Sequence, residues 1–145
     1  MAVMERYLIF SLGEDFFAFE AGDIGEAFDY QKVYPLPLAP ECMLGLINRL
    51  GNPFALVDIS PLIKAERPKN SRAITLKDPE EKIAIAIDDV VDIAEIHDRE
   101  KTLLNDADAL AKSRFKYNSR DVTALNLEAI LRSLEEEIES IGDDH

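Results

Sequence analysis

The sequence predicts a mainly β protein, arranged as a barrel or a sandwich, from three observations. Short apolar runs with period-two alternation recur along most of the chain, as expected for strands buried on one face. Gly, Pro, Asp and Asn, which favour turns, separate these runs. Only one long segment, near the C-terminus, has the three-and-four spacing of an amphipathic helix. Many short strands with one long helix are typical of barrels, which close every sheet edge, and of sandwiches.

Length and charge limit the possible functions. The chain has 145 residues, which predicts a single domain over residues 1–145. Hydrophobic residues make up 47% of it and charged residues 31%, so we expect a folded core rather than disorder. The formal net charge of -13 argues against nucleic acid and anionic membrane surfaces as partners. It favours basic partners, although a solvated acidic surface explains the same charge.

The sequence predicts a cytoplasmic protein without membrane insertion. No basic segment followed by an apolar run opens the chain, and no apolar run approaches the roughly 20 residues of a membrane helix. Cys42 is the only cysteine, so no internal disulfide can form, as is usual in a reducing compartment.

The first half of the chain contains two predicted hairpins. Residues 7–12 and 16–20 alternate in hydrophobicity around a Gly-Glu-Asp turn, and residues 43–50 and 54–59 are apolar runs joined at a Gly-Asn turn.

Three shorter segments complete this half. Residues 22–28 have apolar side chains at helical spacing and predict a short helix. Prolines interrupt residues 33–38, which predicts an edge strand or an extended segment. A Ser-Pro pair predicts one helical turn at 60–63.

The second half contains further strands and the long helix. The predicted strands are residues 73–76, 82–87, 90–96, 115–117 and 121–125. Residues 97–114 are polar and give no clear assignment. Asn126 is the predicted cap of a helix over about 127–141, packed on the domain or, alternatively, docked on another chain. Its apolar stripe consists of Leu127, Ile130, Leu131, Leu134, Ile138 and Ile141.

The residue types needed for catalysis are scarce. The two histidines, His97 and His145, form no set with a nucleophile, and the glycines form no phosphate-binding loop. Asp88, Asp89 and Asp92 cluster after a strand, which allows a hard-cation site or a turn that tolerates acids. We therefore expect no enzyme activity and no cofactor.

Residues 44–58 carry the most specific motif. Gly45, Asn48, Gly51 and Asp58 match a register of Gly, two apolar residues, Asn-Leu-Arg-Gly, and an apolar strand ending in Asp. This run resembles the central signature of the CheW-like domain family, the adaptors of bacterial chemotaxis.

The resemblance covers nearly all of the chain and is weak only between residues 97 and 120. The matching segments are Tyr-Leu-Ile-Phe-Ser-Leu-Gly at 7–13, Asp-Ile-Gly-Glu at 23–26, Pro40, Ile-Asp-Asp-Val-Val-Asp-Ile at 87–93, and Ala-Leu-Asn-Leu-Glu-Ala-Ile-Leu at 124–131. It implies two small five-stranded β-barrels packed together, with short helices and a C-terminal amphipathic helix. It also implies a non-enzymatic adaptor that couples chemoreceptors to a histidine kinase. One surface of such an adaptor binds the regulatory domain of the kinase, and a groove between the barrels binds the cytoplasmic tip of the receptor.

Two departures from the family pattern concern these surfaces. The family's Leu-Arg order is Arg49-Leu50 here, and successive side chains of a strand point to opposite faces. The family Arg pairs with the Glu that corresponds to Glu26, so here the pair needs a local bulge to re-aim Arg49. Asp89 replaces a family Gly.

The resemblance gives a set of candidate partner-binding residues. These are Glu26, Val33, Leu36, Leu46, Asn48, Arg49, Leu50, Gly51 and Asn52. For Val33, Leu36 and Leu46, a plain core role is the alternative. The alternative functions are an adaptor for another kinase pathway, such as surface motility, that has lost receptor binding, or a β-barrel that binds a small ligand or a metal.

Overall fold

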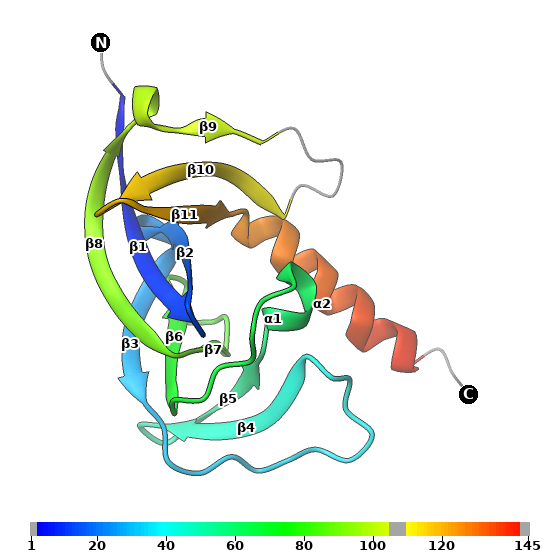
Figure 1. The fold of residues 1–145 in the computed structure, drawn as a ribbon. Coiled ribbons are helices and arrows are strands. Elements are labelled where there is room, and N and C mark those ends of the chain that lie inside the picture. The colour runs from blue at the N-terminus through cyan, green and yellow to red at the C-terminus, as the bar shows by residue number, and fades with distance from the viewer. Residues whose placement is uncertain (1–2, 105–109, 143–145) are drawn as a thin grey trace.

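The structure is a computed structural model that describes residues 3–104 and 110–142, with side chains as far as Ile138. His145 and the side chain of Ile141 therefore lie outside the described residues. In the described residues, eleven strands form two packed sheets, and the first two strands of the chain share a sheet with the last two (Figure 1). The prediction of a mainly β fold is confirmed.

Sheet A has six strands, in the order β8-β1-β2-β11-β10-β9. Every pairing in it is antiparallel except that of β11 with β2, which is parallel. Its strands are β1 (Met4–Leu12), β2 (Asp15–Glu20), β8 (Asp89–His97), β9 (Thr102–Leu103), β10 (Ala111–Tyr117) and β11 (Arg120–Leu125).

Sheet B has five strands, in the order β3-β6-β7-β5-β4. The chain enters it from sheet A through the short 3-10 helix η1 (Ala21–Asp23) and returns through one residue, Asp88. Its strands are β3 (Ile24–Asp29), β4 (Met43–Arg49), β5 (Asn52–Val57), β6 (Arg72–Leu76) and β7 (Ile83–Ile87).

The resemblance implies two closed five-stranded barrels, and this prediction is wrong for the chain. Both sheets are open, and sheet A has six strands rather than five. In sheet B, the outer edge of β4 is occupied by Tyr34, whose backbone exchanges hydrogen bonds of 2.8 and 2.9 Å with Leu46. The edge that β3 would need for closure is therefore already paired at this position. Gly45 permits this approach, because a Cβ there would collide with the Tyr34 carbonyl oxygen.

The strand alternation builds one core between the sheets and a smaller cluster on the other face of each sheet. Along β1, Leu8, Phe10 and Leu12 point into the shared core, whereas Tyr7 and Ile9 point into the cluster of sheet A. The shared core also contains buried residues of sheet B and of the C-terminal helix. These include Ile24, Val57, Ile74, Ile85, Ile87, Ile130 and Leu134.

The helix predicted at residues 22–28 is wrong. η1 ends at Asp23, and β3 then pairs antiparallel with β6. Seven residues are too few for a stable isolated helix, so ladder hydrogen bonds to β6 determine the conformation. The helical turn predicted at 60–63 is confirmed as α1 (Ser60–Ile63).

The sequence predicts no element for residues 97–114, because the strand that lies wholly within them, β9, is short and exposed. The 3-10 helix η2 (Asp98–Glu100) is followed by β9, whose two residues are both exposed at the edge of sheet A. β10 begins at Ala111, four residues before the predicted strand at 115–117.

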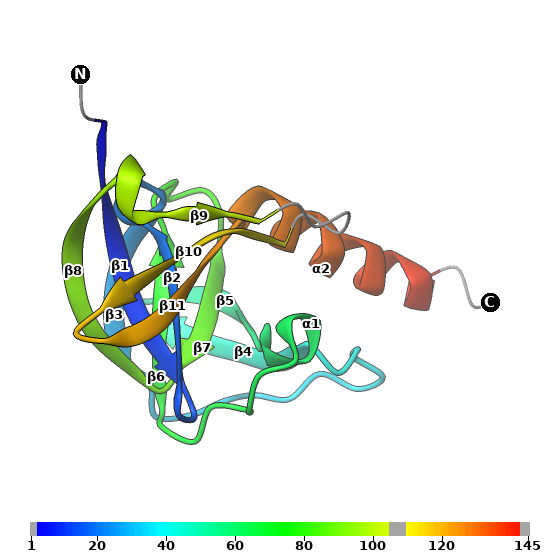
Figure 2. The same cartoon turned by 45° about the horizontal axis from the view of Figure 1, so that its top comes forward.

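The C-terminal helix α2 (Leu127–Gly142) begins as predicted. The Asn126 side-chain oxygen accepts the Ala129 backbone N–H at 3.2 Å, so the cap is confirmed. Ile130 and Leu134 are buried in the shared core, but Ile138 is 42% exposed. In Figure 2 the helix extends past α1 and away from the sheets. An apolar stripe over its full length remains a prediction.

Candidate protein-binding site

The hairpin that carries the central motif turns one residue earlier than predicted. Arg49 pairs with Asn52, so the loop consists of Leu50 and Gly51 rather than of Gly51 and Asn52. Both loop residues have positive φ, 52° and 85°, as a type I′ turn requires. The Asn48 side-chain oxygen accepts the Gly51 backbone N–H at 2.9 Å and holds the turn.

Leu50 is an unusual residue for this position. Its backbone is left-handed, a conformation that costs a residue with a Cβ, and Asn or Gly is the usual choice. Its side chain is 81% exposed, so packing within the chain does not compensate for this cost. A strained, exposed apolar side chain at a hairpin tip is typical of a binding position.

Arg49 and Glu26 form an ion pair in spite of the Arg-Leu exchange. The Arg49 Nε atom lies 2.9 Å from Glu26 Oε1, and the guanidinium lies 4.5 Å from the centroid of the Phe28 ring. The hydrogen bond from Arg49 lowers the pKa of Glu26 below its usual value. β3 and β4 are the two opposite edges of sheet B, so the pair connects edges that no backbone pairing joins in the described residues.

The local bulge expected beside Arg49 is absent, because β4 pairs with β5 without a shift from Gly45 to Arg49; the irregularity next to the pair lies in β3, around Glu26. Register shifts lie between Met43 and Gly45 in β4 and between Ile24 and Ala27 in β3. Each shift changes which side chains of an edge strand point toward a given face.

The other tip residues are open to solvent. Asn48, Gly51 and Asn52 are all exposed, and Arg49 is partly exposed beside them. The structure therefore brings together Glu26, Asn48, Arg49, Leu50, Gly51 and Asn52 at one end of sheet B.

The three apolar candidates are divided between core and surface. Val33 is partly buried against the apolar cluster of sheet B, and Leu46 is partly buried where β4 pairs with Tyr34. Leu36 is 39% exposed. Of the three, only Leu36 offers a substantial apolar surface to a partner.

Sequence reasoning missed two exposed apolar residues next to Leu36. Tyr34 is 51% exposed, and Leu38 is 90% exposed with a left-handed backbone. Alternate residues of an extended segment share a face, so the order Tyr-Pro-Leu-Pro-Leu was the available signal.

The three aspartates of the metal alternative make contacts with other groups. Asp88 accepts backbone N–H groups, Asp89 pairs with Arg72, and Asp92 accepts the Tyr117 hydroxyl. The described part of the chain holds no group of three or more His, Cys, Asp or Glu residues that could bind a metal ion. The ligand-binding barrel is also unsupported, because neither sheet closes on itself in the part of the chain that the structure describes.

Comparison with solved structures finds a similar fold. The structure is similar to the crystal structure of the scaffolding protein TtCheW from Thermoanaerobacter tengcongensis, with a TM-score of 0.73 and 19% sequence identity. The match covers 86% of this chain and 90% of TtCheW. At this level of identity, the likeness shows the fold.

The profile of the CheW-like domain matches residues 6–135. The chain therefore belongs to the CheW-like domain family, whose members are scaffolds and adaptors rather than enzymes. No curated protein sequence matches it. Within residues 3–104 and 110–142, no helix has the length and apolar character to cross a membrane.

Proposed function

We propose that this protein is a cytoplasmic adaptor that couples chemoreceptors to a chemotaxis-type histidine kinase through protein–protein contacts. Membership of the CheW-like family supports this role in general. The kinase would bind through its regulatory domain and the receptor through its cytoplasmic tip. The proposed activity is assembly, so it needs neither a cofactor nor a catalytic group.

The observation that carries the proposal is the exposed tip of the β4–β5 hairpin. Leu50 offers an apolar anchor, and Arg49 lies beside it with its guanidinium oriented by Glu26 and Phe28. Arginine is enriched among the residues that contribute most to interfaces, and burying the exposed Leu50 side chain would add a hydrophobic contribution. Because Glu26 fixes the guanidinium before binding, less side-chain entropy is lost when a partner docks.

Capture of the kinase regulatory domain by this protein tests the proposal. We expect Arg49→Ala to weaken binding by at least about tenfold, as loss of a central interface residue does. Arg49→Glu alone should also weaken it. If orientation by the pair matters, Arg49→Glu combined with Glu26→Arg should recover part of the loss.

The matched control is Arg99→Ala, which removes an exposed arginine from η2 at the other sheet. It should leave capture unchanged. Capture of the kinase that is equally strong for the Arg49 and Arg99 variants would remove the hairpin from the interface. Absence of capture by the unmodified protein would count against the kinase partnership.

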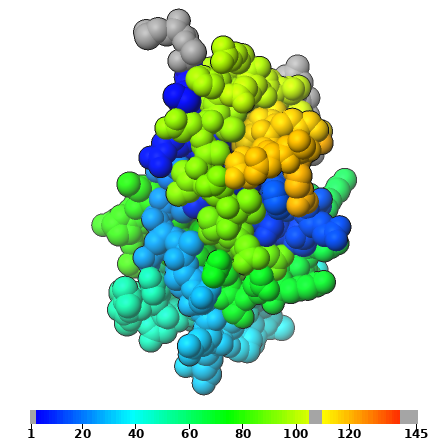
Figure 3. Space-filling model, turned by 60° about the vertical axis from the view of Figure 1, so that its left-hand side comes forward, coloured from blue at the N-terminus to red at the C-terminus, as the bar shows by residue number. Residues whose placement is uncertain are grey.

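A second candidate function, an adaptor that does not bind receptors, is favoured by one feature of the sheet boundary. In Figure 3, β8 of sheet A lies beside β3 of sheet B. Arg72 joins these strands, since it pairs with Asp29 at 2.9 Å and with Asp89 at 3.7 Å. Asp89 stands where the family has Gly, so its carboxylate adds a charged contact at the boundary where the family's receptor groove would lie. Capture of a kinase but of no receptor tip would support this candidate.

A further inference from the structure

Asp88 occupies a special place in the topology, because it alone connects β7 of sheet B to β8 of sheet A. It is buried, and its carboxylate accepts three backbone N–H groups. Sequence reasoning considered this residue as a metal ligand, as part of an acidic turn and as part of the family-like segment at 87–93. The geometry gives it a different role.

The two carboxylate oxygens of Asp88 accept hydrogen bonds from segments of different sheets. Oδ2 accepts the Gly13 N–H at 2.7 Å, in the turn between β1 and β2 of sheet A. Oδ1 accepts the Lys69 and Asn70 N–H groups at 2.6 and 3.0 Å, in the loop that leads into β6 of sheet B. One side chain therefore ties together two segments that belong to opposite sheets.

Asp88 is held in its charged form at this position. Burial by itself would raise the pKa of its carboxyl group, but the N–H groups of Gly13, Lys69 and Asn70 outweigh this effect and lower the pKa below its usual range. Hydrogen bonds to a charged acceptor are stronger than those between neutral groups.

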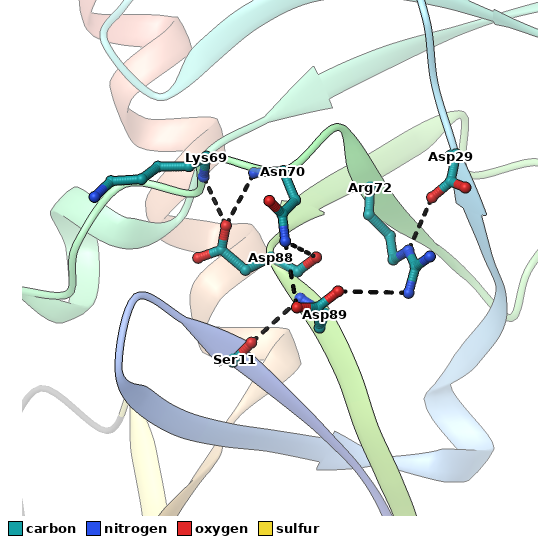
Figure 4. Close-up of polar contacts among 7 residues, drawn as sticks. All are labelled: Ser11, Asp29, Lys69, Asn70, Arg72, Asp88 and Asp89. Carbon is teal, nitrogen blue, oxygen red and sulfur yellow. Dashed lines mark hydrogen bonds and ion pairs between the residues drawn. The ribbon is translucent and has the colours of Figure 1, made fainter.

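A second layer of polar contacts surrounds the carboxylate (Figure 4). The Asn70 side-chain amide donates to the Asp88 carbonyl at 3.2 Å and to the Asp89 carboxylate at 3.3 Å. Ser11 of β1 accepts the Asp88 N–H through its carbonyl at 3.0 Å and the Asp89 N–H through its hydroxyl at 3.2 Å. These contacts orient the crossover but do not replace either oxygen of Asp88.

We propose that Asp88 is a positioning residue that fixes sheet A relative to sheet B, and with them the surfaces that each sheet offers to partners. The role needs a carboxylate, because both oxygens must accept hydrogen bonds at once. An amide of the same shape has one acceptor and one donor, so it can serve only one sheet. The consequence for partners rests on the proposed function, whereas the effect on the sheets does not.

Asp88→Asn tests this role with little change in volume. Spin labels on cysteines that replace Lys77, after β6, and Lys116, in β10, report the distance between the sheets, because both positions are exposed. The native Cys42 is buried and stays unlabelled. We expect a narrow distance distribution in the parent protein and a broader or displaced one in Asp88→Asn.

Asp92→Asn is the matched control. Asp92 is exposed and contacts only its neighbour Ile93 and Tyr117, both within sheet A, among the contacts that the structure describes. Its distance distribution should equal that of the parent. A distribution for Asp88→Asn that superimposes on the parent would overturn the proposal.

Two further measurements keep the test decisive. If Asp88→Asn does not fold, as judged by far-UV circular dichroism, hydrogen exchange of the parent protein replaces it, and the amides of Gly13, Lys69 and Asn70 should all be protected. Rapid exchange at Gly13, or at both Lys69 and Asn70, would then overturn the role. In the folded Asp88→Asn protein, hydrogen exchange should accelerate at Gly13 or at Lys69 and Asn70, because one side loses its acceptor.

The effect on partners separates this proposal from the proposed function. In Asp88→Asn, binding of the kinase domain alone should be retained, whereas simultaneous capture of kinase and receptor tip should fall by about tenfold. If the parent protein captures no partner, the proposed function fails. The distance measurement then still decides whether Asp88 positions the sheets.

Discussion

Leu50 combines a left-handed backbone with an exposed apolar side chain. Leu50→Asn should raise the free energy of unfolding by about 1 kcal/mol, because Asn tolerates the left-handed backbone better than Leu. The same change should weaken kinase capture, since it removes the exposed apolar anchor. Urea unfolding and the capture experiment measure the two effects. A loss of stability instead would mean that Leu50 packs within the chain.

Glu5 gives the molecule a defined acid dependence. The hydrogen bond with the Glu20 carboxyl, supported by Lys101 at 3.1 Å and the Tyr7 hydroxyl at 3.2 Å, lowers the pKa of Glu5 from 4.5 to about 2. The same hydrogen bond raises the pKa of Glu20, because that carboxyl must keep its proton to donate it. The stabilisation is therefore largest where Glu5 is ionised and Glu20 is protonated, and it is lost both as the pH falls toward 2 and as Glu20 ionises at higher pH.

The variant Glu5→Gln should therefore be less stable than the parent by about 1 kcal/mol near pH 4.5, after allowance for solvent screening, and the difference should shrink toward neutral pH as Glu20 ionises. The difference should disappear as the pH approaches 2, where the parent carboxyl is protonated as well. Urea unfolding at several pH values measures it, with the exposed Glu95→Gln as control. A difference that stays constant with pH would show that Glu5 acts by packing alone.

At the scale of elements, the first half of helix α2 packs into the shared core and holds the helix on the sheets. Ile130 is fully buried in the shared core, whereas Ile138 is exposed. We expect Ile130→Ala to lower the free energy of unfolding by about 3 kcal/mol and Ile138→Ala to change it by less than about 0.5 kcal/mol. Thermal or urea unfolding compares the two. A large loss for Ile138→Ala would mean that the helix is buried farther along, against this chain or a second copy.

Local sequence patterns were sufficient to predict most of the helices and strands. Both predicted hairpins are present because period-two alternation and turn residues act over a few positions. The same local evidence failed for β3, where the apolar spacing suits a helix but the pairing with β6 makes a strand. It failed for β9 because an exposed edge strand needs no apolar residues.

At the scale of the molecule, the two sheets share one core. Phe10 is fully buried in it and lies 5.4 Å from Phe19, ring centroid to ring centroid. We expect Phe10→Ala to lower the stability by about 4 kcal/mol and to accelerate hydrogen exchange in β10 of sheet A and β6 of sheet B alike. Acceleration confined to sheet A would show that the sheets unfold separately. It would also argue against the predicted single domain.

The sequence by itself determined the class of fold, the strands of the two hairpins, the cap of α2 and the family motif. These features depend on residues close together in the chain. Only the tertiary structure decided that Arg49 reaches Glu26, 23 residues away, across two edges of one sheet. It alone decided that Asp88 joins Gly13, 75 residues away, to the loop before β6. Such contacts depend on how sheets curve and pack, and the local periodicity of a sequence does not encode that geometry.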